Sequence, residues 1–256
     1  MKKQMSIMSY NPFSLEGKTI LVTGASSGIG QATAIACSQM GASIIITGRN
    51  KERLQQTYDD MLPNDGHKQI CADLVTEEGI SELLNSVPKI DGLVLCAGKG
   101  VTLPLQFATR EKFNDIFEIN FFSPVELLRL IYKKKLLNKE ASVVFVSSIG
   151  GVYSSLPGNA VYGASKSALN SIMKYAAREF AQRKIRVNSI CPGMTETPFI
   201  HRGTLTDDDF SKDVEKYPLK RYGNPSDIAN GILFLLSDAS SWMTGQSLVI
   251  DGGYTL

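Results

Sequence analysis

The stretch TILVTGASSGIG, residues 19–30, joins a short apolar run to a glycine-rich turn and then to a helical pattern. Glycine lets the backbone turn tightly and approach a ligand closely. A helix that begins near Gly30 would point free N–H groups and its positive dipole end at an anion. The stretch therefore predicts a strand and a phosphate-binding turn made by Gly24, Ser26, Ser27, Gly28, Ile29 and Gly30. Its spacing, Gly-x-x-x-Gly-x-Gly, differs from the usual dinucleotide fingerprint, and a purely structural glycine turn is the alternative.

Short apolar runs alternate with longer amphipathic runs along the rest of the chain. We expect strands at 19–22, 43–47, 69–71, 93–96, 143–146, 186–190 and 248–250, and helices at 30–40, 50–61, 77–86, 110–137, 162–183 and 226–236. The strand runs are continuously apolar, which is typical of parallel strands covered by helices on both faces. The pattern predicts an α/β fold, a Rossmann-like doubly wound parallel sheet of about seven strands in the order 3-2-1-4-5-6-7. Such sheets bind ligands at the carboxyl ends of their strands.

The composition is that of an ordinary soluble protein. The chain has 256 residues, of which 43% are apolar and 20% charged, and a net charge of +2 that favours neither nucleic acid nor an anionic membrane. We expect a tail at 1–13 and one domain at 14–256, with no signal peptide or membrane span. The four cysteines are far apart and only two histidines occur. We therefore expect free thiols, a cytoplasmic location and no metal site.

The second expected strand ends at Thr47-Gly48-Arg49. An NAD-binding fold usually places an acid here, about 20 residues after the glycines, to hold the ribose hydroxyls. Arg49 instead fits a ribose 2′-phosphate, so NADP(H) is favoured over NAD(H), with a solvated arginine as the alternative. Asp73 and Leu74, after the third strand, are candidates for the adenine edge of the site, although Asp73 could equally cap a helix.

Tyr162 and Lys166 are four residues apart, so on a helix their side chains share one face. A free phenol has a pKa of about 10, and a nearby ammonium group lowers it. The pair could therefore act as a general acid or base at neutral pH. Taken alone, the pair is more simply read as a half-buried tyrosine and a solvated lysine.

Several motifs, taken together and in order, resemble the short-chain dehydrogenase/reductase family over about residues 15–256. The glycine turn at 23–30 looks like its cofactor motif, and Cys96-Ala97-Gly98 stands where the family has Asn-Ala-Gly. Cys96 is a departure whose effect on local hydrogen bonding the sequence leaves open. Further matching positions are Asn120, Ser148, Tyr162 and Lys166 for the catalytic tetrad, and Pro192, Gly193 and Thr195 for the cofactor contacts after the sixth strand. The resemblance also implies cofactor contacts at Ala97, Gly98, Tyr162 and Lys166. The subgroup most similar in appearance is that of 3-oxoacyl-[acyl-carrier-protein] reductases.

The resemblance implies a role for each tetrad residue. Ser148 would donate a hydrogen bond to the substrate carbonyl, with neighbouring Ser147 as the competing candidate. Tyr162 would protonate the developing alkoxide. Lys166 would bind the nicotinamide ribose and lower the pKa of Tyr162. Asn120 would hold a water in a proton relay, or would be a satisfied core amide.

The implied function is an NADP(H)-dependent oxidoreductase that transfers hydride between the nicotinamide and a ketone or secondary alcohol, with a 3-oxoacyl thioester among the candidate substrates. A sugar, polyol or steroid-like alcohol dehydrogenase is the alternative enzyme, and a non-catalytic NADP-binding regulator is the alternative of another class. Residues 194–222 are expected to form a lid over the substrate. Arg129 with the lysines at 133–135 could meet an acidic carrier protein or form a solvated helix face. The resemblance also implies a homotetramer or homodimer.

Overall fold

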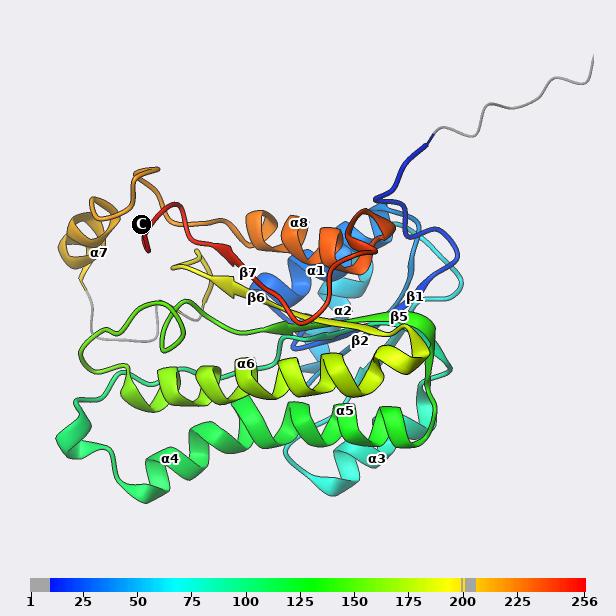
Figure 1. Ribbon diagram of the computed structural model, residues 1–256, viewed down its shortest axis with the longest axis horizontal. Helices are drawn as coiled ribbons and strands as arrows, with labels where there is room; N and C mark the ends of the chain where they lie inside the picture. Colours follow the sequence, from blue (N-terminus) through cyan, green and yellow to red (C-terminus); the bar gives the residue numbers. More distant parts are fainter. Residues whose placement is uncertain (1–9, 199, 201–205) are drawn as a thin grey trace, which may run out of the picture.

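A parallel sheet of seven strands forms the centre of the protein, seen in a computed structural model that describes residues 10–198, 200 and 206–256 (Figure 1). The order β3-β2-β1-β4-β5-β6-β7 confirms the expected topology. The strands are β1 (Thr19–Thr23), β2 (Ser43–Gly48), β3 (Lys68–Cys71), β4 (Ile90–Leu95), β5 (Leu137–Val146), β6 (Arg186–Pro192) and β7 (Ser247–Ile250). Their carboxyl ends share one edge of the sheet, at the end of the molecule where helix α6 begins.

Helices cover both faces of this sheet. The α-helices are α1 (Gly28–Gln39), α2 (Lys51–Asp60), α3 (Glu77–Ser86), α4 (Arg110–Phe117), α5 (Ser123–Lys133), α6 (Ala160–Phe180), α7 (Asp207–Val214) and α8 (Pro225–Leu236). Residues of α1, α2 and α8 pack into one apolar core, and residues of α3, α5 and α6 pack into a second core on the opposite face. The sheet is thus the middle of three layers.

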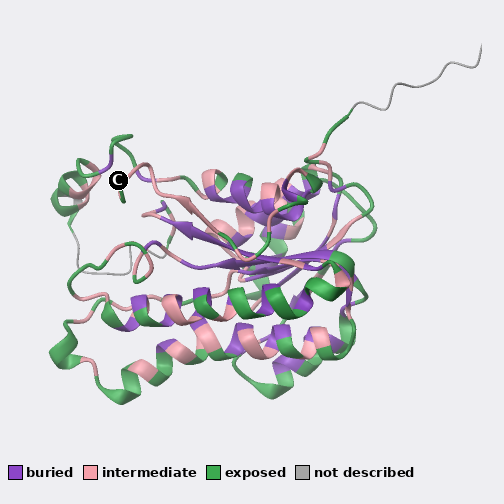
Figure 2. Ribbon diagram, viewed as in Figure 1, coloured by how far each residue is buried: buried purple, intermediate pink, exposed green. Residues whose placement is uncertain are grey.

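Strand β1 shows why the apolar runs do not alternate with polar residues. Leu21 packs into the core beneath α5 and α6, whereas Ile20 and Val22 pack into the core beneath α1 and α8. All three side chains are fully buried. Since successive side chains point to opposite faces, a strand buried on both faces is apolar at consecutive positions, as β1 is at residues 20–22. Figure 2 shows this burial through the centre of the sheet.

The helix expected at 110–137 is wrong in its extent. It is divided into α4, a π-helical segment η2 (Glu118–Phe122) and α5, and it ends at Lys133. Leu137 instead begins β5 and pairs with Ile90 of β4. The leucines at 136 and 137 continue a helical apolar pattern, but their backbone pairs with the neighbouring strand, where Ile90 N donates to the carbonyl of Leu136 at 2.8 Å.

The structure describes only part of the expected N-terminal tail and part of the expected lid. Next to the expected tail boundary, Phe13 lies against Phe234 of α8 with ring centroids 6.4 Å apart, and Ala239 N donates to the carbonyl of Pro12. Most of the tail, residues 1–9, lies outside the described residues, as do residues 199 and 201–205 of the expected lid. The described part of that segment contains α7, which begins with a capping box between Thr206 and Asp209. No helix in the described part of the chain is long and apolar enough to cross a membrane.

Phe145, in the inner strand β5, is a sharp test of the buried sheet because its side chain has no solvent exposure. Phe145→Ala should lower the free energy of unfolding by about 3–5 kcal/mol through lost burial and the cavity left behind. Urea unfolding at fixed protein concentration measures this change. Leu62→Ala, at a side chain that is 52% exposed, should change it by less than about 0.5 kcal/mol. Equal losses in the two variants would contradict the burial pattern.

Candidate functional site

The glycine turn between β1 and α1 is built for close backbone approach. Gly24 has a φ of +66°, and a Cβ added there would lie 2.8 Å from the Cα of Ala97. A Cβ at Gly30 would collide with the carbonyl of Gly24. The N-cap residue of α1, Ser27, makes no side-chain cap, and no acid occurs in the first turn of the helix. The first N–H groups of α1 therefore fit a pyrophosphate, since no acid or cap competes for them.

Thr23 braces the junction between this turn and the end of β4. Its hydroxyl accepts hydrogen bonds from the backbone N–H groups of Cys96 and Ala97, at 3.0 and 3.2 Å, and donates to the carbonyl of Val94 at 3.2 Å. Thr23 was not among the predicted site residues. The feature that could have indicated it is a hydroxyl side chain at the last position of the first strand. The contact between Thr23 and Cys96 is made through the backbone N–H of Cys96 and does not involve its side chain.

Arg49 and Asp73 lie side by side beyond the ends of β2 and β3. The Arg49 guanidinium is 4.0 Å from the Asp73 carboxylate, and both side chains are largely exposed. Asp73 does not cap α3, because Thr76 accepts the capping bond from Gly79 N at 3.1 Å. Leu74 is buried, and its carbonyl accepts a hydrogen bond from Ser123. Arg49 thus offers an accessible cation at the position expected for the 2′-phosphate.

The segment after β6 crosses over the glycine turn. Gly193 N donates to Ile250 O, and the buried Thr195 donates from its hydroxyl to Gly193 O at 3.1 Å. The methyl carbon of Thr197 would lie 3.0 Å from a Cβ added at Gly28. Pro192 ends β6 and turns the chain toward this position. The expected contacts at 192–195 therefore lie on the same side of the sheet edge as the glycine turn, joined by Thr197, which the sequence analysis did not single out.

Ser148 and Tyr162 are brought together at the same edge. The Ser148 side chain hydrogen-bonds to Tyr162, and it also accepts from Gly150 N at 3.0 Å. Ser147 points elsewhere, since its buried hydroxyl donates to the carbonyl of Lys166 at 3.0 Å. Of the two candidate serines, Ser148 is therefore the one whose hydroxyl lies beside the phenol.

Burial shifts the pKa values of Tyr162 and Lys166 in opposite directions. Desolvation raises the pKa of Tyr162 to about 12, although the hydrogen bond from Ser148 acts against the rise. Desolvation lowers the pKa of Lys166 to about 8. The Lys166 ammonium donates to Val146 O at 2.8 Å and lies 5.8 Å from the centre of the Tyr162 ring. In the protein alone, desolvation of the phenol is the largest effect on the pKa of Tyr162, and the expectation that Lys166 lowers this pKa stays a prediction.

Asn120 is fully buried in the π-helical segment η2. Its amide oxygen accepts from Lys99 N at 2.8 Å, and its amide nitrogen donates to Lys99 O at 2.9 Å and to the Ser165 hydroxyl at 3.0 Å. A Cβ added at Gly98 would lie 3.2 Å from that oxygen and 3.5 Å from the Lys166 amine. Asn120 therefore ties the loop after β4 to α6 beside Lys166, and a single lone pair on its oxygen remains for a water.

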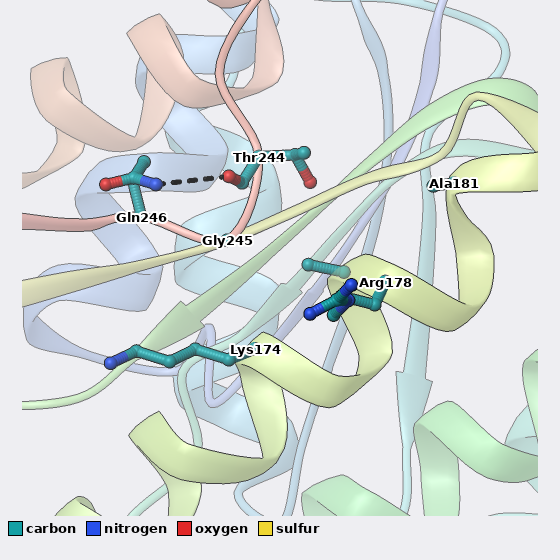
Figure 3. A pocket seen from close by; sticks show the side chains of 7 residues that line it. Lys174, Arg178, Ala181, Thr244, Gly245 and Gln246 are labelled. Carbon is teal, nitrogen blue, oxygen red and sulfur yellow. Dashed lines mark hydrogen bonds between the residues drawn. The ribbon is translucent and has the colours of Figure 1, made fainter.

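A groove of about 400 Å³ lies elsewhere, near the other end of α6 (Figure 3). Its lining residues are Lys174, Ala177, Arg178, Ala181, Thr244, Gly245 and Gln246. Lys174 follows Tyr162 by roughly 18 Å along the helix, at about 1.5 Å per residue. The groove is therefore separate from the Tyr162 site.

Comparison with known proteins agrees with this arrangement. A family model described as enoyl-(acyl carrier protein) reductase matches residues 24–255. A solved structure described as a short-chain dehydrogenase/reductase family protein is 32% identical, with a TM-score of 0.83 over 95% of this chain and 100% of its own. The chain belongs to the short-chain dehydrogenase/reductase family. Within it, the chain is 37% identical to the 3-oxoacyl-[acyl-carrier-protein] reductase FabG of Rickettsia felis, over 93% of this chain and 97% of the relative.

A second solved structure of this fold bears on the cofactor. It is described as an NAD(P)-dependent gluconate 5-dehydrogenase from Beutenbergia cavernae with NADP bound at low occupancy. It is 29% identical to this chain, with a TM-score of 0.85 over 95% of this chain and 99% of its own. Membership of the short-chain dehydrogenase/reductase family makes this chain an NAD(P)-dependent oxidoreductase that acts on CH–OH or carbonyl groups.

The buried amine of Lys166 makes a pH-dependent contribution to stability that needs no bound group. Its pKa is about 8 in the folded chain and about 10.4 when unfolded, so the unfolded state binds more protons between these values. The unfolding free energy of the wild type should therefore rise with pH across this window relative to that of Lys166→Met. Urea unfolding of both proteins from pH 7 to 10.5 tests this. Stability curves that stay parallel would contradict the lowered pKa.

Proposed function

We propose that this chain is an NADP(H)-dependent reductase that uses Tyr162 as the general acid and base for a ketone or secondary alcohol. The observation that carries the proposal is the hydrogen bond between Ser148 and Tyr162 beside the buried Lys166, at the sheet edge that also holds the glycine turn. Two hydroxyl groups on one side of an oxygen atom can stabilise and protonate an alkoxide.

Each residue then has a distinct part in the reaction. When bound, the nicotinamide supplies or accepts the hydride. Ser148 orients the substrate oxygen, and Tyr162 holds the proton that this oxygen receives. A phenol with a pKa of about 12 retains that proton at neutral pH, so the residue is ready to act as an acid in the direction of reduction. Lys166 would hold the ribose with its amine, and Asn120 would hold the loop and a relay water next to it.

Tyr162→Phe removes the proton donor and keeps the ring. We expect turnover of any ketone substrate to fall about 10²- to 10⁴-fold because the alkoxide loses its acid. Binding of NADPH, measured by fluorescence titration, should persist. Turnover that survives in Tyr162→Phe would refute the assignment, whereas loss of NADPH binding would show that the variant disturbs the fold.

The preference for NADP(H) rests on Arg49. Its exposed guanidinium stands at the carboxyl end of β2, where it could pair with a 2′-phosphate. The neighbouring carboxylate of Asp73 partly offsets the positive charge of Arg49, so we expect a moderate preference for NADP(H) over NAD(H). The glycine turn at 24–30, Ala97 and Gly98, and the segment 192–195 would hold the rest of the dinucleotide.

Arg49→Ala should lower kcat/KM for NADPH by roughly 10- to 100-fold and leave that for NADH nearly unchanged, because charge-assisted hydrogen bonds have about this strength. Arg178→Ala, in the groove of Figure 3, is the matched control and should alter neither value. Steady-state rates with both cofactors measure the ratio. An enzyme that already prefers NADH would overturn the reading of Arg49.

The substrate is proposed from the relatives. The Rickettsia felis relative supports a 3-oxoacyl thioester, and the gluconate 5-dehydrogenase structure supports a sugar acid or polyol as the alternative. Oxidation of NADPH and NADH against a panel of both substrate types distinguishes them. Cofactor binding with no turnover across that panel would favour a non-catalytic NADP-binding regulator instead.

Carrier docking through the basic residues of α5 has little support. Arg129 is engaged by Glu126 at 2.6 Å, and α5 ends at Lys133, at the opposite end of the molecule from the start of α6 (Figure 1). We further propose that residues 194–222 close over the substrate and that the protein assembles as a homotetramer or homodimer in the cytoplasm, where its four free cysteines would stay reduced.

A further inference from the structure

The two loops that border the site contain a single charged residue. These loops are residues 96–108, which follow β4, and residues 147–159, which follow β5. Lys99 is the only acidic or basic side chain in either of them. The two loops also hold one another, because Leu103 N donates to the carbonyl of Gly158 at 2.7 Å. Within these two loops, one cation therefore stands among uncharged residues.

The backbone of Lys99 is placed by the site itself. Its N–H and carbonyl both bond to the side-chain amide of Asn120, at 2.8 and 2.9 Å. The preceding residue, Gly98, faces both that amide and the amine of Lys166. Lys99 is thus held one residue away from the group of side chains around Tyr162.

The side chain of Lys99 is available for a ligand. It is exposed, and within residues 10–198, 200 and 206–256 it forms no ion pair. Its ammonium group is carried by a flexible four-carbon side chain, which can turn toward an anion bound between the two loops. By contrast, Arg129, a basic residue of α5, is already paired with Glu126.

We propose that Lys99 selects substrates that carry a carboxylate or another small anionic group within one side-chain length of the reacting carbon. This inference rests on the proposed function and narrows its substrate class. An acid would gain a charge-assisted hydrogen bond from Lys99, whereas a neutral ester of the same shape would not. A carrier-bound thioester has a neutral reacting end and would gain nothing there.

The test compares each of two keto acids, 3-oxobutanoate and 4-oxopentanoate, with its methyl ester, using NADPH and the full chain. The readout is the ratio of kcat/KM for the acid to that for the ester. Lys99→Gln should lower this ratio roughly 10- to 100-fold, and Lys99→Arg should keep most of it because the charge remains. Lys89→Gln removes an exposed lysine just before β4 and should leave the ratio unchanged.

Each other outcome overturns the inference in a recognisable way. An equal ratio in the wild type and Lys99→Gln would refute it while leaving the proposed function intact. A higher KM for NADPH with acid and ester alike would place Lys99 at the cofactor instead. The proposed function fails, and the inference fails with it, if two results occur together. The wild type reduces none of the four compounds, and its activity on other carbonyl substrates is the same in Tyr162→Phe. Misfolding of Lys99→Gln is detected by NADPH binding, and the decision then rests on Lys99→Arg against Lys99→Met.

Discussion

Burial of the central sheet on both faces is the constraint on which the rest of this structure depends. Helices of the two outer layers cover the strands, so that the side chains along the strands are mostly apolar. The carboxyl edge is where the backbone leaves the sheet in loops, and where N–H groups and side chains can meet a ligand. The glycine turn, the loops after β4 and β5, and the start of α6 all meet at that edge, although they are far apart in the sequence.

The same burial sets the chemistry of the site. Tyr162 and Lys166 lie at the margin between core and edge, where desolvation disfavours both a phenolate and an ammonium. Their pKa values therefore move apart: the pKa of Tyr162 rises to about 12, and the pKa of Lys166 falls to about 8. The pair holds a proton on the phenol at neutral pH, and any added positive charge near the ring would favour the phenolate.

Much of this arrangement was predictable from local patterns. The continuous apolar runs indicated a covered parallel sheet, and the helix expected at 77–86 has the bounds of α3. Other features depended on contacts across the fold. A π-helical turn at Asn120 interrupts a sequence that reads as one helix, and there the Asn120 amide contacts Lys99 and Ser165, which are distant in the sequence. Thr76, rather than Asp73, caps α3, and only the path of the chain decides between two such neighbouring candidates.

By itself, the sequence determined the layered fold, the glycine turn and the family, since apolar periodicity and glycine spacing act over a few residues. The tertiary structure alone decided which of two adjacent serines faces Tyr162, how Thr23 holds Cys96 and Ala97, and that burial raises the pKa of the phenol. These outcomes depend on distances between elements and on exclusion of water. Neither the distances nor the exclusion of water can be predicted from the spacing of residues along one strand or helix.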